Sequence, residues 1–360
     1  MNRSEMILKM IVEYFIKTAE PVGSKTLIDE YNLDYSSATI RSEMNALEKE
    51  GFLEKTHTSS GRVPSKKGYE YYVSNLREER VDSSVKYAIA KVLDQKAQSV
   101  EEVIKQSCEI LSNMTNLASV VLGPKVNEER LVSIQVIPIG NNTATAVFVT
   151  DQGYVENKTF MIDEKTHLDD VKKTVDLLNS RLSGTPISDV IPKMEAMRPA
   201  LTDFVVGQDA VYQTLFKAFI SFAGERMNLF GKERLLDQPE FADDGKKLRQ
   251  LLALLDDPSA LRNALETSKK SESGNMSVKI GTPEQGLDDV SIVSAKLAIP
   301  GGQNASISLL GPKRMDYDRA ISLLQYVSKQ LDEYFSREKK GEKVQCQTKT
   351  KAKNPSKSKK

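Results

Sequence analysis

Arginine, serine and asparagine side chains recur along residues 37–50 at the three- and four-residue spacing of a helix face. Side chains of these types can hydrogen-bond base edges and phosphates in a nucleic-acid groove. Ala38 keeps the N-terminal end of this face small, which favours close approach to a duplex. The chemistry that these residues suggest is hydrogen bonding to DNA, carried by Ser37, Thr39, Arg41, Ser42 and Asn45.

Each of these residues also has a simpler interpretation. Arg41 can bond guanine, contact a phosphate or remain solvated on the helix surface. The hydroxyl of Ser37 can be used in capping the helix instead of contacting DNA. The sequence of the helix alone is therefore compatible with two interpretations, binding in a DNA groove or a polar face exposed to solvent.

A basic segment follows this helix and favours groove binding. Residues 55–69 contain four basic side chains and no acidic one, around an expected turn at 58–61. We expect a hairpin here, in which His57, Arg62, Lys66 and Lys67 contact the DNA backbone or the minor groove. Lys66 and Lys67 have an alternative role at the start of the next helix.

Three helices must position these side chains. Residues 4–19 alternate apolar and polar at helical spacing, and Pro21 and Gly23 end that helix. A short helix is expected at 25–32, and a third begins at Ser36 or Ser37 and ends at Gly51. Its apolar residues recur at i, i+4 and i+7, namely Ile40, Met44 and Leu47. Three helices followed by a basic hairpin are the chain order of a winged helix-turn-helix.

Three segments carry a resemblance to a known family. They are SSATIRSEMNALEKEGFLEKTHTSSGRVPSKKGYEYYV at 36–73, LLDQPEF at 235–241 and LGPKRMDY at 310–317. In this order they closely resemble the motifs of the heat-inducible transcription repressor family, HrcA, over about residues 1 to 338. Lys313 stands where a small polar residue is expected, and the lysine-rich tail exceeds the usual length of the family.

The resemblance implies an α+β multidomain fold: an N-terminal winged helix-turn-helix and a GAF-like α/β domain that carries an inserted helical dimerisation domain. We expect residues 1–97 to form the winged-helix domain with its connecting helix. Residues 98–162 and 225–338 are expected to form the two parts of the GAF-like domain, with 163–224 inserted and 339–360 a disordered tail.

The resemblance also implies a function. It predicts a negative regulator of class I heat-shock operons, which encode chaperonin and DnaK-type chaperones. Such a repressor binds an inverted-repeat operator as a homodimer, and a GroEL-type chaperonin maintains its active fold. An alternative is a winged-helix regulator whose GAF-like domain senses a metabolite. We expect a cytoplasmic bacterial protein associated with the nucleoid.

The charge distribution places any DNA affinity in a local patch. The chain of 360 residues has 51 basic and 50 acidic side chains. Residues 339–360 hold nine lysines and one glutamate, a net charge of +8, so the remaining 338 residues sum to −7 because the total is +1. The lysine-rich tail has two interpretations, weak DNA affinity and solubility.

Metal and catalytic chemistry find no support in the sequence. The two histidines, His57 and His167, are far apart, and the cysteines Cys108 and Cys346 are too distant in sequence to indicate a disulfide framework. Phosphate-binding glycine loops and nucleophile motifs are absent from the sequence. We therefore expect no enzyme activity, no cofactor and no metal. Charged residues near the N-terminus argue against a signal peptide, and the longest uncharged run, 131–150, reads as a β-hairpin rather than a membrane span.

An aromatic stripe at 204–222 is the candidate dimer contact. A recognition helix reads only a few base pairs, so a symmetric partner is needed for selectivity. Aromatic residues favour both protein cores and interface centres, and core is the commoner use. We assign the interface provisionally to Phe204, Tyr212, Phe216 and Phe219.

Overall fold

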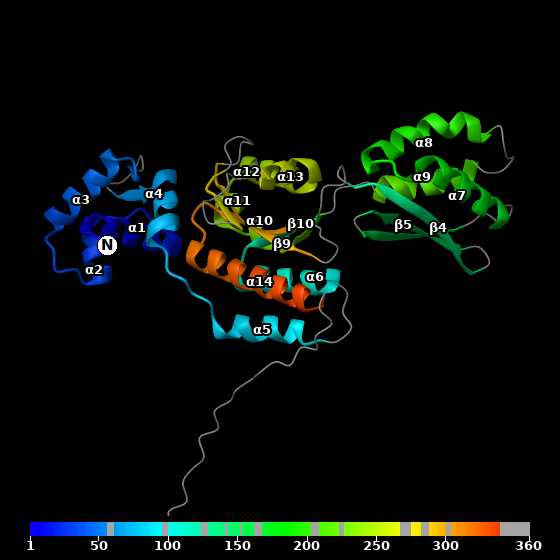
Figure 1. Ribbon diagram of the computed structural model, residues 1–360. Coiled ribbons are helices and arrows are strands. Elements are labelled where there is room, and N and C mark those ends of the chain that lie inside the picture. Colours follow the sequence, from blue (N-terminus) through cyan, green and yellow to red (C-terminus); the bar gives the residue numbers. More distant parts are fainter. Residues whose placement is uncertain are drawn as a thin grey trace, which may run out of the picture.

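The computed structural model describes residues 1–55, 61–95, 100–123, 129–140, 143–151, 153–161, 168–202, 209–222, 227–266, 275–281, 288–299 and 304–338. They form an N-terminal unit, a central unit and an inserted unit, which follow one another across Figure 1. Helices and antiparallel sheets occur together, so the expected α+β class is confirmed.

The N-terminal unit begins with three helices and a short hairpin, as the sequence predicted, and ends with a fourth helix and a π-helix. Its elements are α1 (Arg3–Thr18), α2 (Ser24–Tyr31), α3 (Ser37–Lys49), β1 (Leu53–Lys55), β2 (Arg62–Pro64), α4 (Lys66–Tyr71) and the π-helix η1 (Tyr72–Leu76). The apolar side chains of α1, α2 and α3 meet in one core that includes Ile7, Ile11, Leu27 and Ile40. Val22, between α1 and α2, pairs with Arg62 and adds a third short segment to the hairpin.

The central unit is built on a five-stranded antiparallel sheet with the strand order β7-β3-β10-β9-β8. The strands are β3 (Ala118–Leu122), β7 (Met227–Phe230), β8 (Met276–Lys279), β9 (Val290–Ala298) and β10 (Asn304–Pro312). One face carries α6 (Val100–Thr115) and α14 (Tyr317–Glu338), with α5 (Ser83–Leu93) outside them. The other carries α10 (Lys232–Leu236), α11 (Pro239–Ala242), α12 (Gly245–Asp256) and α13 (Pro258–Glu266).

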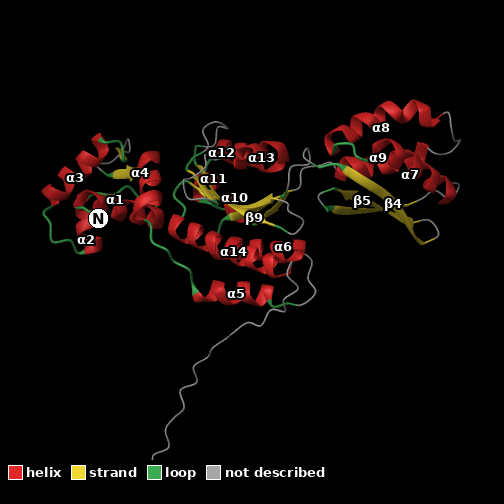
Figure 2. Ribbon diagram, in the orientation of Figure 1, coloured by secondary structure: helices red, strands yellow, loops and turns green. Residues whose placement is uncertain are grey.

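Both faces of this sheet are buried. Along β3, Ala118, Val120 and Leu122 pack with the helices α10–α13. Val121 points to the opposite face and joins the core under α6 and α14. This alternation follows from the two-residue period of a strand, and Figure 2 shows helices on both sides of the sheet.

The inserted unit lies between β3 and β7, two strands that are neighbours in the central sheet. It contains β4 (Leu131–Gly140), β5 (Thr143–Thr150), β6 (Val155–Met161), α7 (Leu168–Leu182), α8 (Ile187–Thr202) and α9 (Asp209–Phe222). Phe148 of β5 packs against Phe219 and Phe222 of α9, with ring centroids 4.7 and 5.1 Å apart. The Asn179 side chain on α7 makes two 2.7 Å hydrogen bonds to the backbone of Ile134.

The insertion begins earlier than we expected. We placed residues 98–162 in the GAF-like domain and started the insertion at 163, but β4–β6 form a separate three-stranded sheet. This sheet shares a core with α7–α9, so the inserted unit is a sheet covered by helices rather than a helical domain. The strands themselves were predicted, including the β4–β5 hairpin. The sheet that they join depends on contacts between segments distant in sequence.

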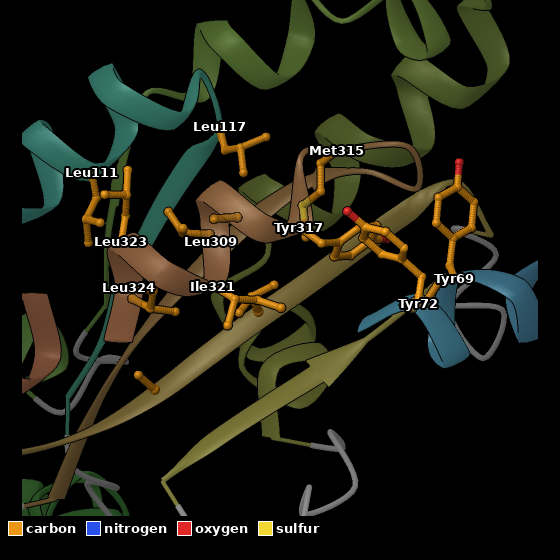
Figure 3. Close-up of a cluster of buried hydrophobic side chains, with 14 of the residues drawn as sticks. Tyr69, Tyr72, Leu111, Leu117, Leu309, Met315, Tyr317, Ile321, Leu323 and Leu324 are labelled. Atoms are coloured by element: carbon orange, nitrogen blue, oxygen red, sulfur yellow. The ribbon is translucent and has the colours of Figure 1, made fainter. Parts of the chain in front are cut away.

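The N-terminal and central units meet at a cluster of buried side chains (Figure 3). The rings of Tyr69 on α4 and Tyr317 at the start of α14 lie 5.7 Å apart. Tyr72, the first residue of η1, is buried in the same cluster. No helix in the described part of the chain combines the length and apolar character that crossing a bilayer requires.

Candidate nucleic-acid interface

The helix α3 is anchored through one face and exposes the other. Its apolar side chains Ile40, Met44 and Leu47 are buried, as predicted. Ser36 is the N-cap, because its Oγ accepts a 3.1 Å hydrogen bond from the backbone of Thr39. Ser37 is therefore not the cap, and its hydroxyl lies 2.9 Å from that of Ser24 on α2.

Three of the predicted DNA contacts lie together on the exposed face of α3. Arg41, Ser42 and Asn45 are exposed, and within the described part of the chain Arg41 and Ser42 have no side-chain hydrogen bond or ion pair. Thr39 is half-buried, and its Oγ1 lies 2.8 Å from the Ser36 hydroxyl. The face thus offers one unpaired guanidinium, one hydroxyl and one amide on adjacent turns.

Arg62 does not lie where we expected. We assigned it to the DNA backbone, but its side chain is only 9% exposed and points to α3. Its Nε donates to Glu48 Oε2 at 2.7 Å, and its Nη2 donates to Asn45 Oδ1 at 2.9 Å. Arg62 therefore links the hairpin to α3 within the protein. The sequence did not predict these hydrogen bonds because Glu48 and Asn45 lie on α3, whereas Arg62 lies in the hairpin.

Glu48 is held ionised by this contact. Burial works against the charged carboxylate, but hydrogen bonds from Lys55 and Arg62 outweigh it and lower the pKa of Glu48. Lys55 Nζ lies 3.2 Å from Glu48 Oε1. The negative charge on this side of the helix is consequently neutralised by two cations of the hairpin.

The two lysines after the hairpin are exposed at the first turn of α4. Ser65, not a lysine, caps this helix, because its Oγ accepts from the backbone of Gly68 at 3.0 Å. Lys67 Nζ donates to the carbonyl of Glu50 at 2.7 Å and lies 4.3 Å from the centre of the Phe52 ring. Lys66 has no ion pair among the described residues. His57 lies outside the described residues.

The predicted dimer residues lie mainly in the core of the inserted unit. Tyr212 and Phe219 are buried, and Phe216 is half-buried with its ring stacked 6.0 Å from Tyr212. Phe204 lies outside the described residues. Buried rings cannot contact a second chain, so Tyr212 and Phe219 serve the core, which was the alternative interpretation of the stripe.

A different surface of the inserted unit exposes apolar side chains. The face of the three-stranded sheet opposite Phe148 includes Ile137, Val155 and Met161, which are 50%, 54% and 81% exposed. The outward residues of β6 are all uncharged: Val155, Asn157, Thr159 and Met161. The alternation of side chains along YVENKTFM indicated that every second residue of this strand shares a face. Which of the two faces is exposed could be assigned only once the structure showed the face that α9 covers.

The central and C-terminal sequence motifs meet at the junction with the N-terminal unit. Arg314 pairs with Glu240 through Nε, and its Nη1 donates to the carbonyl of Ile16 on α1 at 3.2 Å. A pocket of about 370 Å³ opens beside them, and Lys313 also lines it. Two motifs of the central unit therefore hold the N-terminal unit, a role that sequence reasoning did not assign.

Comparisons with known proteins identify the family. The family model described as "HrcA protein C terminal domain" matches residues 101–321. The chain is 38% identical to the "Heat-inducible transcription repressor HrcA" of Bacillus pumilus (strain SAFR-032) over 344 residues, 93% of this chain and 98% of that one. It is 37% identical over 334 residues to the protein of the same name from Halalkalibacterium halodurans, covering 92% and 96% of the two chains.

One solved structure has a similar fold over almost the whole chain. It is titled "Crystal structure of a hypothetical protein at 2.2 A resolution", with a TM-score of 0.66 and 23% identity, and the match covers 94% of this chain and 99% of that one. The printed names of the relatives describe transcription repressors and not enzymes, in agreement with the sequence prediction. This chain belongs to the HrcA family of heat-inducible transcription repressors.

Proposed function

We propose that this chain represses heat-shock operons by binding an inverted-repeat operator as a homodimer, with α3 in the major groove. The observation that carries the proposal is the exposed face of α3, where Arg41, Ser42 and Asn45 lie on a helix fixed by its buried face. Groove recognition needs such a rigid element with short polar side chains. The N-terminal unit is accordingly a winged helix-turn-helix, and the central unit is a GAF-like domain.

Charge supports local contact rather than bulk attraction. Without its last 22 residues the chain has a net charge of −7, so it needs a confined cationic surface to approach phosphates. Arg41 on α3 and Lys66 after the hairpin are exposed and unpaired among the described residues. We assign Arg41 to a base or phosphate and Lys66 and Lys67 to the flanking backbone.

Pairing of two copies supplies selectivity in this proposal. Two-fold symmetry places two recognition helices on half-sites separated by whole helical turns, so the operator is an inverted repeat. We assign the contact between copies to the uncharged outer face of β4–β6, since exposed apolar side chains concentrate there. Depletion of charge is typical of interface centres.

The family also suggests how repression is relieved. We infer that a GroEL-type chaperonin maintains the active fold in the bacterial cytoplasm, where the repressor is bound to the nucleoid. Misfolded chains that occupy the chaperonin during heat shock then lower the amount of active repressor. If chaperonin left operator affinity unchanged while a small metabolite raised the melting temperature, the metabolite-sensing alternative would be favoured.

The test is binding of the full chain to promoter duplexes from chaperonin and DnaK-type operons, by fluorescence anisotropy at two salt concentrations. Arg41→Ala is expected to weaken binding to the inverted repeat by about tenfold. Arg249→Ala, an exposed arginine on α12, serves as the matched control and should bind like the original chain. Equal affinity for the repeat and for a scrambled duplex would contradict the proposal.

A further inference from the structure

The hairpin residue Arg62 fixes the orientation of the Asn45 amide. A guanidinium group carries only N–H donors, so the Asn45 atom that faces Arg62 Nη2 at 2.9 Å must be the carbonyl oxygen. The two ends of an asparagine amide are ordinarily hard to distinguish, but here the chemistry of the partner decides. The NH₂ group of Asn45 is consequently turned away from Arg62.

The backbone of Arg62 is itself held in place. Its N–H and C=O exchange two 2.9 Å hydrogen bonds with Val22, on the loop between α1 and α2. The second anchor is Glu48, which accepts from Arg62 Nε at 2.7 Å and is also paired with Lys55. With 9% of its side chain exposed, Arg62 is a buried and rigid partner for the amide.

The free end of the Asn45 amide is available for a ligand. Asn45 is exposed one helical turn after Arg41, and among the described residues nothing bonds its Nδ2. Nδ2 carries two N–H donors and no acceptor. In the major groove guanine presents two acceptors, O6 and N7, whereas cytosine presents the N4 donor. Adenine offers an acceptor and a donor side by side, which suits an amide that presents both of its ends.

We propose that Arg62 is a positioning residue that makes Asn45 a donor-only contact, which selects guanine over cytosine at one position of each operator half-site. This proposal rests on the function proposed above and adds the identity of the base that Asn45 reads. Arg62 itself contacts no DNA in this assignment. It acts by turning the amide oxygen inward, away from the groove.

The substitution Asn45→Asp inverts the proposed contact with little change of shape. An aspartate still accepts from Arg62 Nη2, so the link between hairpin and helix persists, but its second oxygen offers an acceptor to the groove. The added negative charge weakens binding to every duplex, whereas only a changed contact alters the order of the four bases at one position. The order of preference is therefore the informative measurement.

The substitution Arg62→Met releases the amide while keeping a long side chain in the buried site. Asn45 can then present either end, so discrimination at its position should decrease. Preferences at positions read by Arg41 or Ser42 should remain, because those side chains do not contact Arg62. Thermal unfolding of each variant shows whether the fold is retained.

The experiment selects randomised duplexes with the full chain and then measures affinities for the four base pairs at each half-site position. We expect the original chain to prefer guanine to cytosine by about tenfold at one position. Asn45→Asp should reverse that order there alone, and Arg62→Met should flatten it there alone. If Arg62→Met does not fold, the result with Asn45→Asp decides.

Two results would overturn the inference, and they are distinguishable from failure of the proposed function. One is an Asn45→Asp chain whose base preferences match the original at every position. The other is a folded Arg62→Met chain that loses affinity uniformly and keeps the guanine preference. A chain without base preference at any position would instead refute the operator-binding function, and this inference with it.

Discussion

Two buried tyrosines at the contact between the N-terminal and central units differ in the hydrogen bonding of their hydroxyl groups. Tyr69 is 1% exposed, and its hydroxyl has no hydrogen-bond partner among the described residues. Tyr317 is fully buried, and its hydroxyl donates to the carbonyl of Lys313 at 2.7 Å and lies 2.9 Å from Ser291 Oγ. Replacing each with phenylalanine keeps the ring in the cluster of Figure 3 and removes only the hydroxyl.

The two replacements should change stability in opposite directions. An unsatisfied buried hydroxyl is unfavourable, so Tyr69→Phe should stabilise the chain by about 1 kcal/mol. Tyr317→Phe leaves the Lys313 carbonyl and the Ser291 hydroxyl without this partner, which should cost about 1–3 kcal/mol. For a cooperative unit of this size the cost corresponds to a melting temperature lower by roughly 2–10 °C.

The assay is differential scanning calorimetry of the full chain, with urea unfolding as a second measure. The transition that responds should be the one shared by the N-terminal and central units, since both tyrosines belong to their common core. The inserted unit has a separate core and should unfold as before in both variants. Destabilisation by Tyr69→Phe, or an unchanged Tyr317→Phe chain, would refute the reasoning from hydroxyl bonding.

Three further predictions concern a buried carboxyl, the outer sheet face and a close backbone contact. Burial raises the pKa of the Asp318 carboxyl in the folded chain, although hydrogen bonds from the Glu78 backbone and the Tyr72 side chain act in the opposite direction. The ionised carboxylate is therefore less favourable in the folded chain than in the unfolded one, and stability falls as the pH rises above the pKa that this carboxyl has in the unfolded chain. Asp318→Asn should raise the melting temperature at pH 7 and have little effect near pH 3. If two copies pair through the outer face of β4–β6 as proposed, Met161→Lys should give a monomer in sedimentation velocity without lowering thermal stability, whereas Tyr87→Lys on α5, where the side chain is 74% exposed against 81% for Met161, should leave the pairing intact. A Cβ at Gly68 would lie 2.2 Å from the Phe52 carbonyl oxygen, so Gly68→Ala should destabilise the N-terminal unit by about 1–3 kcal/mol, while Gly140→Ala, with open space around it, should be close to neutral in the same scan.

Residues from the three sequence motifs meet at the junction between the N-terminal and central units. Glu240 lies in the central motif and Arg314 in the C-terminal one, and they form an ion pair at the surface that receives α1. Arg314 reaches the carbonyl of Ile16, 298 residues away in sequence. The N-terminal motif contributes Tyr69 to the same contact. These segments are therefore parts of one interface between the N-terminal unit and the central unit.

Local sequence determined the elements of the candidate site. Ser36 bonds its own helix three residues on, and Ile40, Met44 and Leu47 recur at the period that buries one face, so α3 and its exposed residues could be predicted. Strand alternation likewise identified β4, β5 and β6. Each of these signals depends on residues within a few positions of each other, where backbone geometry fixes which side chains share a face.

Tertiary structure decided the partners of those elements. The arginine side chain of Arg62 is of a type that commonly contacts phosphates. Only its position beside Glu48 and Asn45 shows that it links the hairpin to α3 within the protein. The sequence left Tyr212 and Phe219 open to a core or an interface role, and their burial, with Phe219 packed on Phe148 of β5, assigns them to the core. The reason is that burial and hydrogen bonding depend on which surfaces meet, and the pairing of distant segments is a property of the whole chain.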